Sequence, residues 1–512
     1  MAYSVKNTLK DPVIILPALF SIIIHLVFVN NLEYHRDELL YFSLGMHPSA
    51  GYNSVPPLIG WVAFVMQNIF GYSVFAVRLF PALLGGVLII LVAALTRELG
   101  GSRFAAFLSG IGLLVSIFFQ RSFFLFQPVH IEIFLWTLII YLVVKYINSL
   151  KGNILILIGV VAGLSLLNKY MAAILLLGLF VIIPFTRYRF VLREKRFLIG
   201  LMTGFLIFLP NLIWQIYRGF PVTGHLSELY DTQLVHMDIP LFLTEQLLMP
   251  FAGSFFTLAG IIFLFGSGMM RKYRFLAYLS LFVIIGLMLL KGKGYYTLGV
   301  FPFLIAAGAV AYEQWISRMW IRILFPMILI IITLPVVPMG IPVFKATGLI
   351  KYFKVQEEKY GMDQGRRFED GTIHSLPQDY ADMLGWEELT SIAVTAYNKI
   401  ENKKACFIYG ENYGQAGAIM VIGKKYGLPE PISFSESFQY WYPDRFEPDI
   451  TSMIYINDEE PGEDLKTLFS RITKVGSITN KHAREYGTSV YICEEPVRSF
   501  NQFWHERTAE NN

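Results

Sequence analysis

Long apolar runs recur along this chain, and they constrain its fold more than any other feature. Hydrophobic residues make up 55% of the sequence and charged residues only 16%, whereas soluble domains carry about 25% charged residues. The runs therefore predict a polytopic α-helical membrane protein with about eleven spans. A re-entrant hairpin is the alternative for the short fifth and sixth runs. The predicted spans are 13–30, 74–96, 104–120, 123–144, 153–168, 170–186, 197–215, 241–268, 275–290, 295–312 and 320–342.

Lysine and arginine differ in number between alternate loops, and this difference predicts the orientation of the chain. Sixteen lie in one set of loops: Lys6, Lys10, Arg97, Arg103, Lys145, Lys151, Arg187, Arg189, Arg193, Lys195, Arg196, Arg271, Lys272, Arg274, Arg318 and Arg322. Six lie in the other set: Arg36, Arg121, Lys169, Arg218, Lys291 and Lys293. Because basic loops stay in the cytoplasm, we expect a multi-pass protein of the cell (inner) membrane with a cytoplasmic N-terminus. An odd number of spans places the C-terminal region outside.

The last third of the chain changes character and predicts a second domain. Residues 343–512 are hydrophilic, with short apolar runs typical of strands in KACFIYG, TSMIYIN and TSVYICEE, and with helical spacing in WEELTSIAVTAYNKI. We expect a transmembrane domain over 1–342 and an extracytoplasmic α/β domain over 343–512. The second domain holds both cysteines, Cys406 and Cys493, which form either a disulfide or two free thiols.

Charged residues gather at the predicted outer ends of the spans. They are Asp37, Glu38, Arg78, Arg121, His130, Glu132, Lys169, Lys291 and Lys293. Glu132 lies about a turn or two inside the fourth span, where an ionised carboxylate is unfavourable by a few kcal/mol unless it faces a polar cavity or a partner. It is therefore a candidate functional residue. The alternative is an internal ion pair with Arg121 or Arg78.

Asp37 and Glu38 open the first outer loop, 30–73. Adjacent residues on a helix point about 100° apart, so only one of the two can enter a given cleft. The stretch LLYFSLGMHPSAGYNSVPPLIGWVAFVMQNIFG that follows is too broken by Pro, Gly and Asn to span, and too apolar for a free loop. It predicts one or two amphipathic interfacial helices that cover an acid-containing cavity.

The segment LKGKGYYTLGVFPFLIAAGA brings two lysines and two tyrosines to the same outer edge. Ammonium groups and phenol hydroxyls can bind phosphate oxygens, although lysine and tyrosine also serve as plain membrane anchors. Lys169 in LLNKYMA has the same two interpretations. The sequence has no Walker-type loop, no HExxH, no CxxC pair and no histidine cluster suited to zinc. Membrane topology and lipid headgroups explain the basic loop 187–196 without nucleic acid.

Taken in order, several segments resemble bacterial glycosyltransferase family 39 proteins of the GT-C fold, relatives of protein O-mannosyltransferases and aminoarabinose transferases. HRDELLYFSLGMH followed by PPLIGW is similar to the family's first outer loop, and FAVRLFPALLGG with TRELGG to its second helix. QPVHIEIFLWTLIIYL resembles a stretch where relatives usually have aspartate, replaced here by Glu132. LNKY, KGKGYYTLGVFPFLIAAGA and YGENYGQAGAIMVIGKKYGLPEPIS complete a resemblance that covers nearly the whole chain.

The resemblance implies a membrane glycosyltransferase. Such an enzyme moves a sugar from a polyprenyl-phosphate donor to an extracytoplasmic acceptor hydroxyl with inversion, and Asp37 would be its general base. The implied catalytic residues are Asp37, Glu38 and Glu132, and the implied phosphate-binding residues are Lys169, Lys293, Tyr295, Tyr296 and Arg78. The expected acceptor- or sugar-binding residues are His35, His47 and His130. The resemblance implies no certain cofactor but allows a divalent cation, as in some relatives, and Asp37 and Glu132 would bind it.

Two other functions stay open at this point. A transporter or flippase of a lipid-linked envelope precursor would also have many spans and buried charges, but the sequence has no inverted repeat and no paired broken helices. A non-catalytic protein of envelope glycan assembly is the third candidate. The expected partners of the enzyme are the lipid-linked donor, membrane lipids and a lipid, glycan or protein acceptor. The sequence identifies neither the sugar nor the acceptor.

Overall fold

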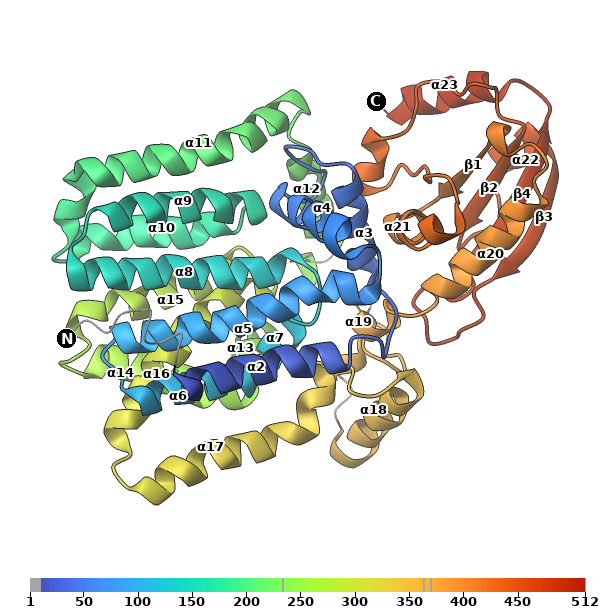
Figure 1. Ribbon diagram of the computed structural model, residues 1–512. Coiled ribbons are helices and arrows are strands. Elements are labelled where there is room, and N and C mark those ends of the chain that lie inside the picture. The colour runs from blue at the N-terminus through green and yellow to red at the C-terminus, as the bar shows by residue number, and fades with distance from the viewer. Residues whose placement is uncertain (1–10, 233, 362–363, 369–370, 512) are drawn as a thin grey trace.

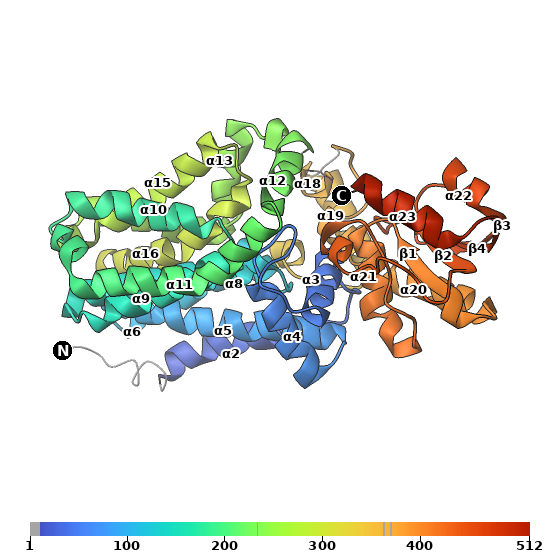
Figure 2. The ribbon, with the colours of Figure 1, turned by 90° about the horizontal axis from the view of Figure 1, so that it is seen from above.

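The computed structural model describes residues 11–232, 234–361, 364–368 and 371–511, and it has two parts (Figure 1). Most long helices of the first part lie side by side with nearly parallel axes, and a small sheet with its own helices covers one end of them (Figure 1 and Figure 2). Lys6 and Lys10, which contributed to the predicted orientation, lie outside the described residues. The helices of the first part are α2 (Pro12–Val27), α3 (Arg36–Met46), α4 (Leu58–Phe70), α5 (Val74–Glu98), α6 (Arg103–Leu114), α7 (Ile117–Ser122), α8 (Pro128–Ser149), α9 (Asn153–Asn168), α10 (Ala172–Ile182), α11 (Lys195–Tyr217), α12 (Pro221–Thr232), α13 (Ile239–Leu248), α14 (Ser254–Gly266), α15 (Phe275–Leu289), the 3-10 helix η6 (Gly294–Val300), α16 (Phe301–Trp315) and α17 (Met319–Thr333).

The predicted multi-pass helical fold is confirmed, but not the number of spans. Among the described residues, six helices are long and apolar enough to cross a membrane, and one bent pair makes a seventh candidate. Four shorter apolar helices, α2, α6, α9 and α10, coincide with the remaining predicted spans. These helices are shorter than the roughly 20 residues that cross a bilayer without help from their neighbours. The total of eleven therefore stays a prediction.

Two helices in the structure differ from the predicted spans, because proline interrupts one predicted span and sets the start of the other. The run 241–268 was expected to be one helix, but α13 and the stretch Phe251–Gly266 meet at 89°. Pro250 lies at this break and Phe251 has φ +48°, so the helical hydrogen bonding cannot continue. The run 123–144 starts later than expected, because Pro128 takes the first position of α8. Glu132 consequently lies just one turn into that helix.

The second part is a four-stranded mixed sheet with helices. The strands are β1 (Cys406–Gly410), β2 (Ser452–Asn457), β3 (Phe469–Ser477) and β4 (Ser489–Pro496), in the order β1-β2-β4-β3, and only β1 and β2 are parallel. The helices are α18 (Ala346–Tyr360), α19 (Gln378–Ala381), α20 (Trp386–Lys399), α21 (Tyr413–Val421), α22 (Glu463–Leu468) and α23 (Phe500–Asn511). The three expected strands and the helix in WEELTSIAVTAYNKI are confirmed. β3 was missed because it is an edge strand with a single buried residue, Phe469, and polar residues through most of its length.

The two cysteines do not pair. Cys406 lies on β1 and Cys493 on β4, with β2 between them, and both are buried free thiols. Burial raises the pKa of each thiol to about 12. Of the two interpretations of the sequence, the separate thiols are therefore correct.

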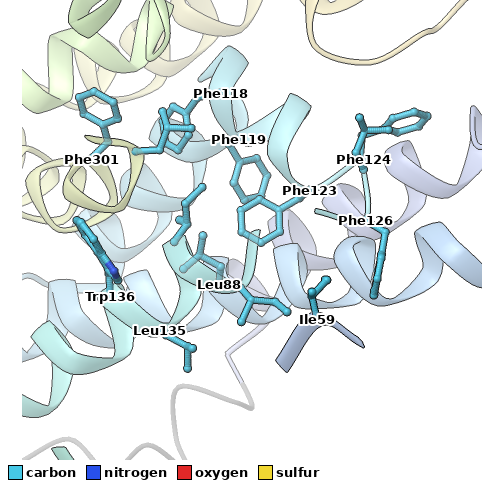
Figure 3. Close-up of a cluster of buried hydrophobic side chains, with 14 of the residues drawn as sticks. Ile59, Leu88, Phe118, Phe119, Phe123, Phe124, Phe126, Leu135, Trp136 and Phe301 are labelled. Carbon is cyan, nitrogen blue, oxygen red and sulfur yellow. The ribbon is translucent and has the colours of Figure 1, made fainter. Parts of the chain in front are cut away.

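The first outer loop holds two helices, as expected, and α3 brings the site residues to the junction of the two parts. It packs between α4 and α21 of the sheet part (Figure 1). Below the junction, a cluster of buried aromatic side chains from α7 and the loop after it fills the space toward α5 and α8 (Figure 3). Figure 3 labels Phe118, Phe119, Phe123, Phe124 and Phe126 of this cluster. The cluster gives the site a rigid apolar base.

Candidate active site

The first turn of α3 carries both acidic residues of the outer loop, and a capping box fixes where it begins. His35 is the N-cap, and its Nδ1 accepts a hydrogen bond from the backbone N–H of Asp37 at 3.1 Å. The backbone N–H of His35 in turn donates to Glu38 Oε2 at 2.9 Å. As the 100° spacing predicts, the two side chains then meet different surroundings.

Glu38 is fully buried and its oxygens are fully used. Arg78 of α5 donates from Nε to Oε1 at 3.1 Å and from Nη2 to Oε2 at 2.9 Å, and the backbone N–H of Phe126 donates to Oε1 at 3.1 Å. Arg78 also donates to the carbonyls of Val29 and Glu33. These contacts favour a structural role for Glu38 and Arg78 over the predicted catalytic and phosphate-binding roles.

Asp37 is half-buried and lies where both parts of the molecule meet. Gln127, the N-cap of α8, donates from Nε2 to Oδ2 at 3.0 Å, and the hydroxyl of Tyr413 on α21 donates to Oδ1 at 3.1 Å. The guanidinium of Arg36 stacks 4.3 Å from the centre of the Tyr413 ring. Each oxygen of Asp37 accepts one side-chain hydrogen bond, so a further lone pair on each can accept a proton or a substrate hydroxyl.

Lys169 and Glu132 form a second cluster with the two tyrosines of the KGKGYY segment. Lys169 Nζ lies 3.2 Å from Glu132 Oε2, and 4.6 Å and 5.2 Å from the ring centres of Tyr296 and Tyr295. Glu132 Oε1 has no hydrogen-bond partner within the described residues. Tyr295 keeps 37% of its surface accessible and lies close enough to Asp37 to interact with it electrostatically. Tyr295 therefore links the second cluster to Asp37.

This pairing corrects the alternative proposed for Glu132, an ion pair with Arg121 or Arg78. Arg121 instead binds Asp379, with 2.7 Å from Nε to Oδ2, and Arg78 binds Glu38. Lys293, the other predicted phosphate-binding lysine, immediately precedes η6 and interacts electrostatically with His225 of α12. It lies next to the tyrosines in the chain.

The three predicted acceptor-binding histidines differ in accessibility. His35 is 4% exposed, and its Nε2 faces Asp379 at 3.6 Å and Asp382 at 3.9 Å. His130 is fully buried among aromatic rings and its Nδ1 accepts from the backbone N–H of Gln127. Only His47 is accessible; it stacks on Trp441 with ring centres 4.2 Å apart and pairs with Glu430. His35 and His130 therefore cap helices, which leaves His47 as the accessible candidate.

Acidic groups beside His35 titrate in unusual ranges. Burial raises the pKa of Asp382 to about 6, although the positive charges near it, His35 and Arg484 among them, oppose the rise. Burial alone would raise the pKa of Asp379 too, but the charge of Arg121 and the contact with His35 hold it below its usual value. Burial also disfavours protonation of His35, and the acidic neighbours outweigh it, so its pKa is raised. This buried network fixes the N-cap directly before Asp37.

The predicted cation ligands do not form a metal site. Among the described residues, no group of three or more His, Cys, Asp or Glu side chains could hold a metal ion. Of the two residues assigned to the cation, Glu132 is already paired with the Lys169 ammonium. Hard cations such as Mg²⁺ and Ca²⁺ need several oxygen ligands, and this donor set does not supply them.

Two of the residues that contact Asp37 were not predicted. Gln127 precedes the expected functional helix, and its capping position before Pro128 was a usable signal. Tyr413 follows β1 within the YGENYGQAG segment, and nothing local in the sequence connects it with Asp37. A third unpredicted residue, Glu436, lies close enough to Asp37 for the two carboxylates to interact.

Parts of the sequence are similar to known proteins. Residues 54–214 match the family described as Dolichyl-phosphate-mannose-protein mannosyltransferase. A relative, the lipopolysaccharide core galacturonosyltransferase RgtA of Rhizobium johnstonii (strain DSM 114642 / LMG 32736 / 3841), is 24% identical over 217 residues, which are 41% of this chain and 42% of that protein. The match thus spans less than half of the relative's length.

The solved structures extend the likeness to the whole fold. ArnT from Cupriavidus metallidurans bound to undecaprenyl phosphate superimposes with a TM-score of 0.61 at 13% identity, over 93% of this chain and 97% of that chain. The same protein in the apo state gives 0.61 at 12% identity, with the same coverage. The GT-C fold predicted from the resemblance is confirmed.

Proposed function

We propose that this chain, which has the GT-C fold of the ArnT-like type, is a membrane glycosyltransferase that uses a polyprenyl-phosphate-linked sugar. It would transfer the sugar, with inversion, to a hydroxyl of a lipid, glycan or protein acceptor outside the cytoplasm. One observation carries the proposal: Asp37, a half-buried carboxylate at a helix N-terminus, lies within electrostatic range of Tyr295, which belongs to a cluster of one ammonium and two phenols. The ArnT structure bound to undecaprenyl phosphate supports the donor class.

Asp37 acts on the acceptor. One carboxylate oxygen of Asp37 takes the proton of the acceptor hydroxyl while the hydroxyl oxygen of the acceptor attacks the anomeric carbon of the donor sugar. The new glycosidic bond forms as the bond from the anomeric carbon to the phosphate oxygen breaks, so the configuration inverts. Gln127 and Tyr413 hold the carboxylate in position. The proton then leaves Asp37 for solvent, since the side chain is only half-buried.

Lys169 and the tyrosines act on the leaving group. The bonding electrons stay with the polyprenyl phosphate, whose negative charge grows in the transition state. An ammonium and phenol hydroxyls placed in advance stabilise that charge. Glu132 holds Lys169 at 3.2 Å, and its second oxygen, which has no partner in the described part of the chain, can bind a sugar hydroxyl. Lys293 is the second cation for the phosphate.

The division of the chain supports the same assignment. We assign residues 1–342 to the membrane part and 343–512 to the outer part, with the N-terminus in the cytoplasm, because of the unequal lysine and arginine counts of the loops. Tyr413 then reaches Asp37 from the outer side. The reaction would take place on the face of the membrane where the carrier presents its sugar, and no step requires a metal ion.

Substitution of Asp37 tests the proposal. Cells that make the wild-type chain, Asp37→Asn or the control Glu463→Gln would be compared by mass spectrometry of their envelope glycans. Glu463 is a suitable control because its side chain is 85% exposed. We expect a mass increment of one sugar that is present with wild type and control, and reduced about 10³-fold with Asp37→Asn because a general base contributes roughly 10²- to 10⁴-fold.

Binding of bare undecaprenyl phosphate separates an enzyme from a transporter. The purified Asp37→Asn protein should bind it within about threefold of wild type, because Asp37 acts on the acceptor rather than on the phosphate. A transporter would keep the glycan increment unless Asp37 lay on its path. An unchanged increment in the Asp37→Asn strain would refute the proposal.

A further inference from the structure

Glu436 of the outer part has features that packing does not explain. It is the first residue of the 3-10 helix η11 (Glu436–Tyr440), and its φ of +55° lies in the left-handed region that favours glycine. Its side chain is 13% exposed, and Oε2 is buried without a hydrogen-bond partner in the described residues. Backbone strain and an unsatisfied buried oxygen are both unfavourable, and where they persist they often mark a functional site.

The neighbours of Glu436 hold it in this conformation. The backbone N–H of Asn53 donates to Ser437 Oγ at 2.9 Å. The side chains of Gln439 and Tyr440 donate to Asn53 Oδ1 at 3.2 Å and 3.0 Å. Asn53 belongs to the Pro-Pro segment of the first outer loop, so η11 is fastened to the membrane part directly after the strained residue. The position of Glu436 relative to α3 is therefore fixed.

The carboxylate of Glu436 lies near Asp37. η11 packs on α21, whose Tyr413 donates to Asp37, and Asp37 and Glu436 each act electrostatically on the hydroxyls of Tyr41 and Tyr413. On the far side, His225 of α12 lies 4.0 Å from Glu436 Oε1. Burial raises the pKa of Glu436 to about 7; Ser54 and Asn53 oppose the rise, and the charges of Asp37 and Glu228 add to it.

We propose that Glu436 is a substrate-binding residue, whose free oxygen accepts hydrogen bonds from ring hydroxyls of a sugar placed at Asp37 and thereby selects that sugar. This inference rests on the proposed function. A carboxylate oxygen with no protein partner has lone pairs that can accept hydrogen bonds, and the ring hydroxyls of a sugar are suitable donors. The hydroxyls belong to the donor sugar or to a sugar acceptor, and the two arms of the experiment separate these sources.

Three variants test the role without loss of the fold. Glu436→Ala removes the carboxylate, Glu436→Gln keeps one acceptor without the charge, and Glu436→Gly also relieves the positive φ. We expect Glu436→Gly to melt at or above the wild-type temperature, and all three to bind bare undecaprenyl phosphate as wild type does. Glu463→Gln is the control for an acidic side chain of the same part.

The donor arm uses undecaprenyl phosphates that carry glucose, galactose, mannose or xylose. If Glu436 binds the donor sugar, wild type should bind one of these sugar-carrying lipids at least about tenfold more tightly than the bare carrier. This is the gain in affinity expected from one hydrogen bond to a charged group. Glu436→Ala and Glu436→Gly then lose that preference. If it binds the acceptor, donor preference is unchanged and the envelope sugar increment of intact cells falls by at least about tenfold.

The pH dependence provides a further readout. Ionisation of Glu436 near pH 7 should strengthen sugar binding as the pH rises from about 6 to 8, and Glu436→Gln should lose this rise. The charged or titratable groups that face Glu436 are Asp37, Glu228, His225, Tyr41 and Tyr413, all of which the variant retains.

The results that would overturn the inference are distinct from those that would overturn the proposed function. Wild-type donor preference together with a wild-type envelope increment in Glu436→Ala would show that Glu436 binds no sugar. A fall in melting temperature in all three variants would assign it a structural role. If Asp37→Asn also kept the envelope increment, the proposed function itself would be wrong.

Discussion

Two carboxylate–cation pairs within the helical part differ in how completely each carboxylate is used. Glu38 and Arg78 are 0% and 1% exposed, joined by two hydrogen bonds, and every oxygen of Glu38 has a partner. Glu132 and Lys169 share a single contact of 3.2 Å, Lys169 is 22% exposed, and one Glu132 oxygen has no partner in the described residues. The first pair is closed, and the second keeps groups available for a ligand.

The difference teaches how to read buried charge in a membrane protein. Intramembrane ionisable residues are functional candidates by default, and each pair has one such member within a predicted span, Arg78 or Glu132. Arg78 of the closed pair is not available to bind a phosphate, because it donates hydrogen bonds to Glu38 and to two backbone carbonyls. The open pair keeps an ammonium beside two phenol rings. Unsatisfied hydrogen-bonding capacity, rather than charge, marks the candidate active site.

The largest effect should follow from opening the closed pair. Arg78→Met leaves the carboxylate of Glu38 buried and unpaired, which lowers the free energy of unfolding by about 3–5 kcal/mol. The measurement is thermal unfolding of the purified protein in detergent. The double variant Glu38→Met/Arg78→Met should regain a large part of the loss, since it buries no charge. Equal stability of Arg78→Met and wild type would remove the distinction between the pairs.

The next effect should separate function from stability at the open pair. Lys169→Met removes a cation from the leaving phosphate, and we expect transfer to fall about 10²- to 10³-fold, as for other preorganised charge-stabilising groups. The melting temperature should change less than for Arg78→Met, because Glu132 loses a single contact at 3.2 Å, whereas Glu38 loses two hydrogen bonds. Transfer is read as the envelope sugar increment, and Lys169→Arg should restore part of it. A collapse in stability would show that this pair is structural too.

A smaller effect is expected where the outer part supports Asp37. Tyr413→Phe removes one of the two side-chain hydrogen bonds to the carboxylate and keeps the ring that stacks on Arg36. Transfer should fall roughly 5- to 20-fold, since a hydrogen bond to a charged group contributes about 1–2 kcal/mol. Binding of bare undecaprenyl phosphate should not change. The result would measure how far the active site depends on the sheet part.

Much of the fold could be predicted because segments that are buried in a membrane or in a core are apolar in sequence. The helical runs, three strands and α20 are continuous in the sequence and apolar where they are buried. The break at Pro250 was missed because apolar residues continue on both sides of it, and β3 because an exposed edge strand needs no apolar pattern. Such features depend on where the chain turns rather than on how apolar it is.

The candidate site was predicted in part, through Asp37, Lys169 and the tyrosines at the outer edge. Its partners could not be, because Gln127 and Tyr413 lie 90 and 376 residues from Asp37 in the sequence. Likewise, nothing in the sequence distinguishes Arg78 from Lys169 as a phosphate-binding residue. That distinction depends on which backbone carbonyls surround the side chain, and these are set by the packing of whole helices.

A third carboxylate–cation pair completes the series and should give the smallest effect. Lys425 and Glu387 meet at 3.1 Å on the surface of the outer part, where they are 52% and 45% exposed. Water solvates both partners and salt screens their attraction, so exposed pairs contribute only about 0–1 kcal/mol. Lys425→Gln should therefore shift the melting temperature much less than Arg78→Met does. Its effect should vanish in 0.5 M salt, because charges are already screened over about 8 Å at ~0.15 M salt. A loss comparable with that of Arg78→Met would mean that burial and shared partners do not set the energy of these pairs, which is the premise of the comparison.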